Sequence, residues 1–93
     1  MKKVNILGTK YKVTKLEHVD DYMHENRYEA YITYDKKSIT LSPNADEQTF
    51  IHEFVHGYLY EIGKGSWNNE DDVEFITKMI VKLNRELTKG VMK

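Results

Sequence analysis

The sequence predicts a small α+β domain in which an N-terminal antiparallel sheet of three to four strands packs on two C-terminal helices. Residues 1–42 contain short runs of alternating apolar and polar side chains, which are typical of strands. Residues 44–89 carry apolar side chains every three or four positions, which is typical of amphipathic helices. The single proline, Pro43, separates the two regions. The 93 residues suffice for one domain, 1–93, with a thin core.

Strands are expected in the first half of the chain because short runs there are rich in β-branched and aromatic residues. These runs are residues 4–6, 11–14, 28–34 and 38–42. Residues 8–10, between the first two runs, are expected to form a turn, and residues 35–37 are expected to join the last two runs as a tight hairpin. In the fourth run Ile39 and Leu41 share one face, as in a sheet covered on one side. The polar residues 17–27 are expected to end the second strand and continue as a loop.

The first helix is expected to begin at residue 44 or 45 and to end near residue 62. Asp46 and Glu47 fall in its first turn, where acidic side chains interact favourably with the helix dipole, and Gly63 is a suitable stop. Its apolar side chains form one arc, which comprises Ile51, Phe54, Val55, Tyr58 and Ile62. Gly57 lies inside this helix and indicates close backbone packing near the metal site described below.

A second helix is expected at residues 70–89. Asn68 or Asn69 is a suitable N-cap, and acidic residues follow in the first turn. The apolar arc of this helix comprises Val73, Ile76, Met79, Ile80, Leu83 and Leu87. Gly90 is expected to end the helix, and the last three residues are expected to fray.

The composition excludes several classes of protein. The chain has no cysteine, which rules out disulfides and thiolate zinc sites. It has 14 Lys and Arg residues against 15 Asp and Glu residues, whereas a chain that binds nucleic acid usually has a clear basic excess. No run of about 18 apolar residues is present, so no membrane span is expected. The first residues do not resemble a signal peptide, and a cytoplasmic location is expected.

The pattern H-E-x-x-H, formed by His52, Glu53 and His56, indicates a metal site. Residues four apart on a helix lie one above the other, so both imidazoles can reach one zinc ion at about 2.0–2.1 Å. The two histidines fall beside the apolar arc, and Glu53 falls farther round toward the polar side. From there its carboxylate can act on a zinc-bound water without coordinating the metal. A catalytic zinc site at the margin of the core is therefore expected.

A catalytic zinc ion usually has three protein ligands. Because the chain has no cysteine, the third ligand is expected from the acidic start of the second helix. Glu70, fourteen residues after His56, is assigned as this ligand, and Glu74, one turn later on the same face, as the group that orients a histidine. The two roles can be exchanged, and Asp72 is a third choice. Acidic residues also favour helix N-termini for structural reasons alone.

These motifs resemble those of a known family. H-E-F-V-H-G at residues 52–57, followed by a glutamate on the next helix, is similar to the gluzincin group of zinc metallopeptidases, and in particular to the small ImmA/IrrE-type enzymes of phages and bacterial mobile elements. Residues 70–76 resemble that family's E-x-x-A-N-x-F-A signature, with Val73, Glu74 and Thr77 in place of its small and amide residues. The resemblance covers residues 28–80.

The resemblance implies a minimal zincin-like fold, zinc as the cofactor and a hydrolase that cleaves a polypeptide, such as one specific regulatory protein. The helix-turn-helix segment that often accompanies such peptidases is missing from this sequence, and no nucleic-acid partner is expected. Two other functions are open. The chain can be a metal-stabilised protein-binding module with little or no turnover, or an α+β interaction protein without metal.

In the predicted mechanism Glu53 takes a proton from the zinc-bound water as the water attacks a peptide carbonyl, and returns it to the leaving amine. The substrate is expected to add as an extended strand to the sheet edge, at residues 38–42. A further hydrogen-bond donor to the oxyanion is expected. The candidates are His18, His24, Tyr22, Tyr28, Tyr58, Tyr60 and Trp67.

Overall fold

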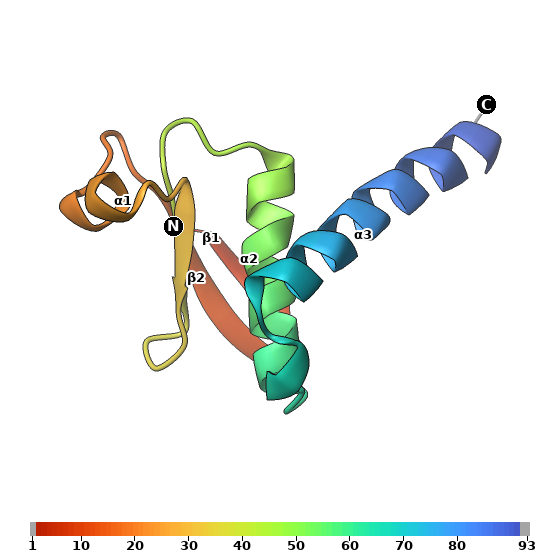
Figure 1. The fold of residues 1–93 in the computed structure, drawn as a ribbon, viewed down its shortest axis with the longest axis horizontal. Coiled ribbons are helices and arrows are strands. Elements are labelled where there is room, and N and C mark those ends of the chain that lie inside the picture. Colours follow the sequence, from red (N-terminus) through yellow and green to blue (C-terminus); the bar gives the residue numbers. More distant parts are fainter. Residues whose placement is uncertain (1, 92–93) are drawn as a thin grey trace.

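The computed structural model describes residues 2–91 and confirms the predicted α+β class, with a four-stranded sheet and two long helices after its last strand (Figure 1). The elements in chain order are β1 (Lys2–Ile6), β2 (Thr9–Lys15), α1 (Asp21–Asn26), β3 (Ala30–Thr33), β4 (Ser38–Leu41), α2 (Glu47–Glu61), the 3₁₀ helix η1 (Gly65–Trp67) and α3 (Glu70–Val91). Within this described range no helix is long and apolar enough to cross a membrane.

The four strands form one mixed sheet in the order β1-β2-β4-β3. The predicted hairpin of β3 and β4 is present, and β1 and β2 also pair antiparallel, across a turn at residues 7–8 rather than the expected 8–10. Because β2 and β4 are parallel, the prediction of an antiparallel sheet was wrong. The reason lies in burial. Tyr11 of β2 and Ile39 of β4 are fully buried, and side-by-side placement of these two strands brings both residues under the same helix.

This strand order also corrects the predicted sheet edge. Residues 38–42 were expected at the edge, but β4 lies between β2 and β3, so the edge strands are β1 and β3, both of which contact α2. A strand at the edge leaves one side of its backbone unpaired. The strands with such an unpaired side are therefore Lys2–Ile6 and Ala30–Thr33, and not Ser38–Leu41.

The segment predicted as a loop at 17–27 contains the short helix α1. Its N-cap is Asp20, whose Oδ1 accepts a hydrogen bond from the Met23 backbone N at 2.8 Å. Arg27 ends the helix in the left-handed conformation, with φ of 58°. Only Met23 is buried in this helix, so the sequence contains no apolar periodicity that would have predicted it.

Helix α2 lies between the sheet and α3 (Figure 1). Apolar side chains of α2 make contacts on both of these sides. Phe50 and Phe54 pack on the sheet, whereas Val55 and Leu59 pack on α3. The helix begins at Glu47, because the Asp46 side chain caps it by accepting from the Thr49 backbone N at 2.8 Å. The predicted start at residue 44 or 45 was therefore slightly early.

Gly57 is the point of closest approach between α2 and the sheet. A Cβ at this position would lie 2.8 Å from Ile6 Cδ1 and 3.1 Å from Ile32 Cδ1. The close packing predicted for this glycine is therefore confirmed, but its partners are Ile6 and Ile32 of the sheet and not the predicted metal ligands.

The C-terminal end of α2 is tied to the sheet by Glu61. Its carboxylate accepts hydrogen bonds from the Thr9 and Tyr11 hydroxyls, at 3.1 and 2.6 Å, and from Lys37 Nζ at 2.9 Å. These hydrogen bonds lower the pKa of Glu61 below its ordinary value. The contacts join α2 to β2 and to the turn before β4, which fixes the helix along the sheet.

Helix α3 crosses α2 near its own start and then extends away from the domain (Figure 1). Val73 is fully buried against α2, but the later part of the predicted apolar arc is exposed: Met79 is 44% exposed, Leu83 53% and Leu87 64%. The helix also continues through Gly90 to Val91, so the predicted stop was wrong. Fraying was predicted for residues 91–93, of which 92 and 93 lie outside the described residues.

Candidate metal centre

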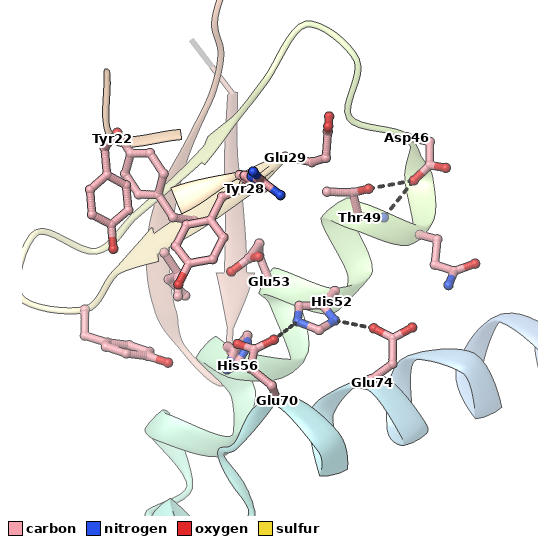
Figure 2. A pocket seen from close by; sticks show the side chains of 16 residues that line it. Tyr22, Tyr28, Glu29, Asp46, Thr49, His52, Glu53, His56, Glu70 and Glu74 are labelled. Carbon is pink, nitrogen blue, oxygen red and sulfur yellow. Dashed lines mark hydrogen bonds and ion pairs between the residues drawn. The ribbon is translucent and has the colours of Figure 1, made fainter. Parts of the chain in front are cut away.

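The centre of the site is formed by two histidines on α2 and one glutamate on α3. His52 Nε2 lies 3.0 Å from Glu70 Oε2, and His56 Nε2 lies 3.0 Å from Glu70 Oε1 (Figure 2). One ligand atom of each residue lies within 4.8 Å of those of the other two. A tetrahedral zinc ion with bonds of about 2.0–2.1 Å needs ligand atoms roughly 3.4 Å apart, which small side-chain rotations can supply. The three residues are therefore placed so that they can hold a metal ion.

The second ring nitrogen of each histidine has its own partner. His52 Nδ1 lies 3.0 Å from Glu74 Oε2, and His56 Nδ1 lies 2.6 Å from Asn68 Oδ1. A proton on Nδ1 that is donated to such an oxygen leaves the Nε2 lone pair free for a metal. Both histidines thus turn Nε2 toward Glu70 and Nδ1 toward an oriented oxygen.

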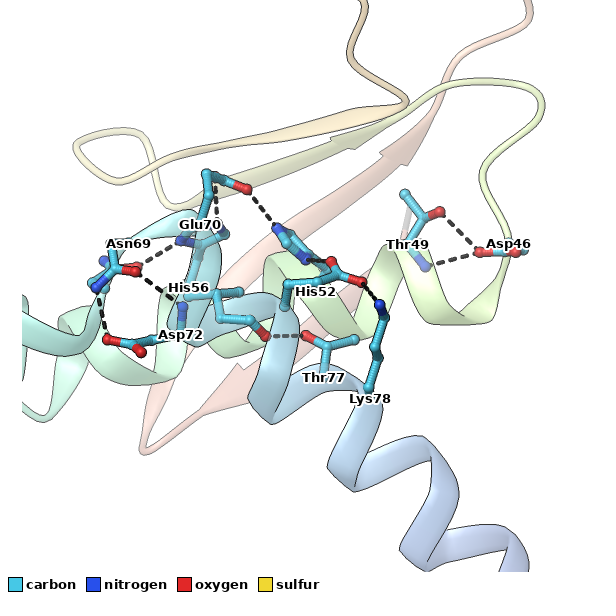
Figure 3. A network of polar contacts seen from close by, with 12 residues as sticks. Asp46, Thr49, His52, His56, Asn69, Glu70, Asp72, Thr77 and Lys78 are labelled. Carbon is cyan, nitrogen blue, oxygen red and sulfur yellow. Dashed lines mark hydrogen bonds and ion pairs between the residues drawn. The ribbon is translucent and has the colours of Figure 1, made fainter.

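The start of α3 holds the acidic side chains in place (Figure 3). Asn69 caps the helix, since its Oδ1 accepts from the Asp72 backbone N at 2.9 Å. Glu70 and Glu74 follow one turn apart and face the two histidines, which are also one turn apart. Asp72, the third choice for a ligand, instead accepts from Asn69 Nδ2 at 2.8 Å and is not among the three clustered residues.

Glu53 lies next to this cluster and is buried, with only 8% of the residue exposed. Burial raises the pKa of its carboxyl to about 7, with Glu70 adding to the rise and His56 opposing it. The sequence-based placement of Glu53 toward the polar side of α2 was therefore wrong. The physical reason is that α2 is covered by the sheet as well as by α3, so the position beside His52 faces the interior.

A cavity of about 570 Å³ opens over the cluster and includes Glu53 in its wall (Figure 2). Its other side is formed by the edge strand β3 and by an aromatic group on and near α1. In that group the Tyr22 ring centroid lies 5.7 Å from that of Tyr28 and 4.8 Å from that of Tyr31. The cavity thus contains a candidate ligand set, a buried acid and an aromatic wall in one space.

The chain has no match among protein-family models, curated protein sequences or solved structures. The chemistry of the site is therefore the basis for assigning a function. That chemistry rests on a set of two nitrogens and one carboxylate, with a buried carboxyl of raised pKa beside it.

Only some of the predicted oxyanion donors line this cavity. Tyr22 and Tyr28 do, while the cavity wall, as far as the described residues form it, includes none of the others, namely His18, His24, Tyr58, Tyr60 and Trp67. Tyr34 lines it as well but was not predicted, and its hydroxyl accepts a hydrogen bond from Asn68 Nδ2 at 3.0 Å. Asn68 had been considered only as a helix cap. Tyr34 and Asn68 come together where the β3–β4 turn contacts the start of α3, and the sequence does not reveal this contact.

Proposed function

We propose that this chain is a zinc-dependent metallopeptidase in which His52, His56 and Glu70 hold the metal and Glu53 is the general base. The observation that carries the proposal is the convergence of these four side chains on one cavity. Two imidazoles and one carboxylate form a common ligand set of catalytic zinc with an open fourth position. When bound, zinc supplies polarisation of the peptide carbonyl and lowers the pKa of water.

The role of Glu53 follows from its surroundings. Its carboxylate lies in the cavity wall beside the three ligand residues, where it can take a proton from the attacking water and return it to the leaving amine. Burial beside the ligands keeps this carboxyl in the cavity wall and shields it from bulk water. Glu74 and Asn68 hold the two imidazoles in the orientation that a metal requires.

The substrate we propose is an extended peptide that pairs with the edge strand β3. Its backbone would add to the sheet through the unpaired side of Ala30–Thr33, and this strand lines the same cavity as Glu53. The rings of Tyr22 and Tyr28 beside it offer contacts to apolar or aromatic side chains of the peptide. The resemblance to ImmA/IrrE-type enzymes adds the proposal that the substrate is one specific cytoplasmic regulatory protein.

The proposal is tested with zinc-loaded protein and a mixed peptide library whose products are identified by mass spectrometry. We expect cleavage by the wild type, loss of cleavage with a chelator, and loss of cleavage in Glu53→Gln with zinc still bound. Glu47→Gln, which removes an exposed carboxylate from the first turn of the same helix, is the matched control and is expected to remain active. Full activity of Glu53→Gln would contradict the mechanism.

A second function is a metal-stabilised module that binds a protein and does not cleave it. The observation that favours it is the exposed apolar surface of α3, formed by Met79, Leu83 and Leu87. The same experiment separates the two functions. A wild-type protein that binds zinc stoichiometrically and cleaves nothing in the library, or in candidate partner proteins, would support the binding module.

A further inference from the structure

Tyr34 lies at the end of β3, where the chain turns toward β4, and its side chain forms part of the cavity wall beside His56. Its ring stacks on that of Tyr60, with 4.4 Å between centroids and 19° between planes. Lys37 Nζ lies 4.8 Å from the centroid of the Tyr60 ring. The stacked ring limits the motion of the half-buried Tyr34 side chain, so its hydroxyl has a defined position.

The hydrogen bonds that lead from His56 to Tyr34 have only one direction once a metal occupies His56 Nε2. Nδ1 must then carry the ring proton, which it donates to Asn68 Oδ1 at 2.6 Å. This fixes the Asn68 amide, whose Nδ2 donates to the Tyr34 hydroxyl oxygen at 3.0 Å. The phenol is therefore the acceptor in its contact with Asn68, and its own proton points elsewhere.

Among the described residues, the Tyr34 hydroxyl makes only the hydrogen bond that it accepts from Asn68, and its own proton is therefore not donated to any of them. The carboxylates of Glu53 and Glu70 act on the phenol through their charge alone. The phenol retains its proton at neutral pH, because burial raises the pKa of Tyr34 above the ordinary value of 10.0, against the smaller opposing effect of the Asn68 hydrogen bond. A donor without a protein acceptor, in the wall of a cavity, is available to an oxygen atom that enters the cavity.

We propose that Tyr34 is a catalytic residue whose hydroxyl donates a hydrogen bond to the oxyanion that forms on the scissile carbonyl. This inference rests on the proposed peptidase function. As the water oxygen bonds to the carbonyl carbon, the electron pair of the C=O bond moves to the oxygen, and the water proton goes to Glu53. Tyr34 keeps its proton and only donates a hydrogen bond, which strengthens as negative charge develops.

The first test measures anion binding rather than hydrolysis. Cobalt(II)-loaded protein is titrated with inorganic phosphate, a tetrahedral anion, and the visible absorption of the cobalt ion reports binding. We expect Tyr34→Phe to weaken phosphate binding roughly ten- to hundred-fold, with cobalt affinity unchanged. Tyr60→Phe is the matched control, since it removes a neighbouring hydroxyl but keeps the ring stack. Equal phosphate affinity of the wild type and Tyr34→Phe would overturn the proposal.

A second variant tests the direction of the hydrogen bonds. Asn68→Asp can still accept from His56 Nδ1, but it cannot donate to Tyr34, so the phenol proton turns toward the new carboxylate and away from the cavity. We expect weaker phosphate binding, with cobalt affinity retained. If Asn68→Asp weakens phosphate binding only through its negative charge, it will do so equally in a Tyr34→Phe protein. If it acts by turning the Tyr34 hydroxyl away, it will have little effect on phosphate binding in a Tyr34→Phe protein. An equal loss in both backgrounds would overturn the proposed direction.

Kinetics separate this inference from the proposed function. For any peptide that the wild type cleaves, Tyr34→Phe is expected to lower kcat by roughly a hundred-fold with little change in KM. Unchanged kcat in an active enzyme overturns the role of Tyr34 but leaves the peptidase intact. If the wild type cleaves no peptide but phosphate affinity depends on Tyr34, the peptidase proposal fails and the assignment of the donor stands.

Discussion

Replacing Glu53 by glutamine is expected to stabilise the metal-free protein at alkaline pH. The folded state raises the pKa of this carboxyl from 4.5 to about 7, mainly through burial. A raised pKa means that the folded protein binds the proton more tightly than the unfolded chain does. The stability that the carboxyl contributes is therefore fully present below pH 4.5 and is lost as the pH rises through about 7. Glutamine stays neutral and avoids this loss.

The magnitude follows from the two pKa values. Their separation, from 4.5 to about 7, corresponds to about 3 kcal/mol, at about 1.4 kcal/mol for each pH unit. We expect the free energy of unfolding of Glu53→Gln to exceed that of the wild type by about 3 kcal/mol more at pH 8 than at pH 4. Any constant difference in packing between glutamine and protonated glutamate cancels in this comparison.

The assay is urea unfolding of both proteins in the presence of a chelator, followed by far-UV circular dichroism at pH 4, 6 and 8. Zinc provides the control, because a cation next to Glu53 favours the ionised carboxylate, and the advantage of the variant at pH 8 should shrink when zinc is added. If the difference between the two proteins is the same at all three pH values, Glu53 is not buried as the structure places it, and the reasoning is refuted.

Three further predictions concern the ligands, the helix–sheet contact and the tie at the end of α2. Zinc affinity, measured by competition with a chromophoric chelator, should fall roughly ten- to hundred-fold in Glu74→Ala and further in Glu70→Ala. The reverse order would make Glu74 the ligand. Gly57→Ala should lower the free energy of unfolding by about 1 kcal/mol, because the clash with Ile6 outweighs the gain in helix propensity. A higher melting temperature for this variant would mean that Ile6 moves aside at little cost. In Glu61→Gln the free energy of unfolding should fall less steeply as the pH is lowered. The folded protein lowers the pKa of Glu61, so its carboxylate contributes stability that is present above the ordinary value of 4.5 and is lost as the pH falls. Superimposable acid-denaturation curves for the two proteins would contradict this.

Most of the fold could be predicted because its signals are local. The strands and the two long helices follow from side-chain periodicity, and Pro43 marks the boundary between them. The parallel pairing of β2 with β4 could not be predicted, because it depends on which strands share the space under α2. Helix α1 was missed for a different reason. It is six residues long and buries only Met23, so it has no periodic pattern.

The candidate site divides in the same way. His52 and His56 were predicted from their spacing on one helix, and Glu70 and Glu74 from their place at the start of the next. Tyr34 was not predicted, because its position depends on where the β3–β4 turn meets the start of α3. Local spacing thus predicts which residues can bind one metal ion together, whereas tertiary packing decides which other side chains surround those residues.

The geometry of the centre follows from how α3 crosses α2. Val73, between the two glutamates, is fully buried against α2, and this contact turns Glu70 and Glu74 toward the histidines. Because each pair spans one helical turn, a single crossing aligns both pairs, so that Glu70 meets both Nε2 atoms while Glu74 meets His52 Nδ1. A rotation of α3 about its axis would break these contacts together. The helix–helix contact at Val73 therefore supports the candidate metal site as well as the core.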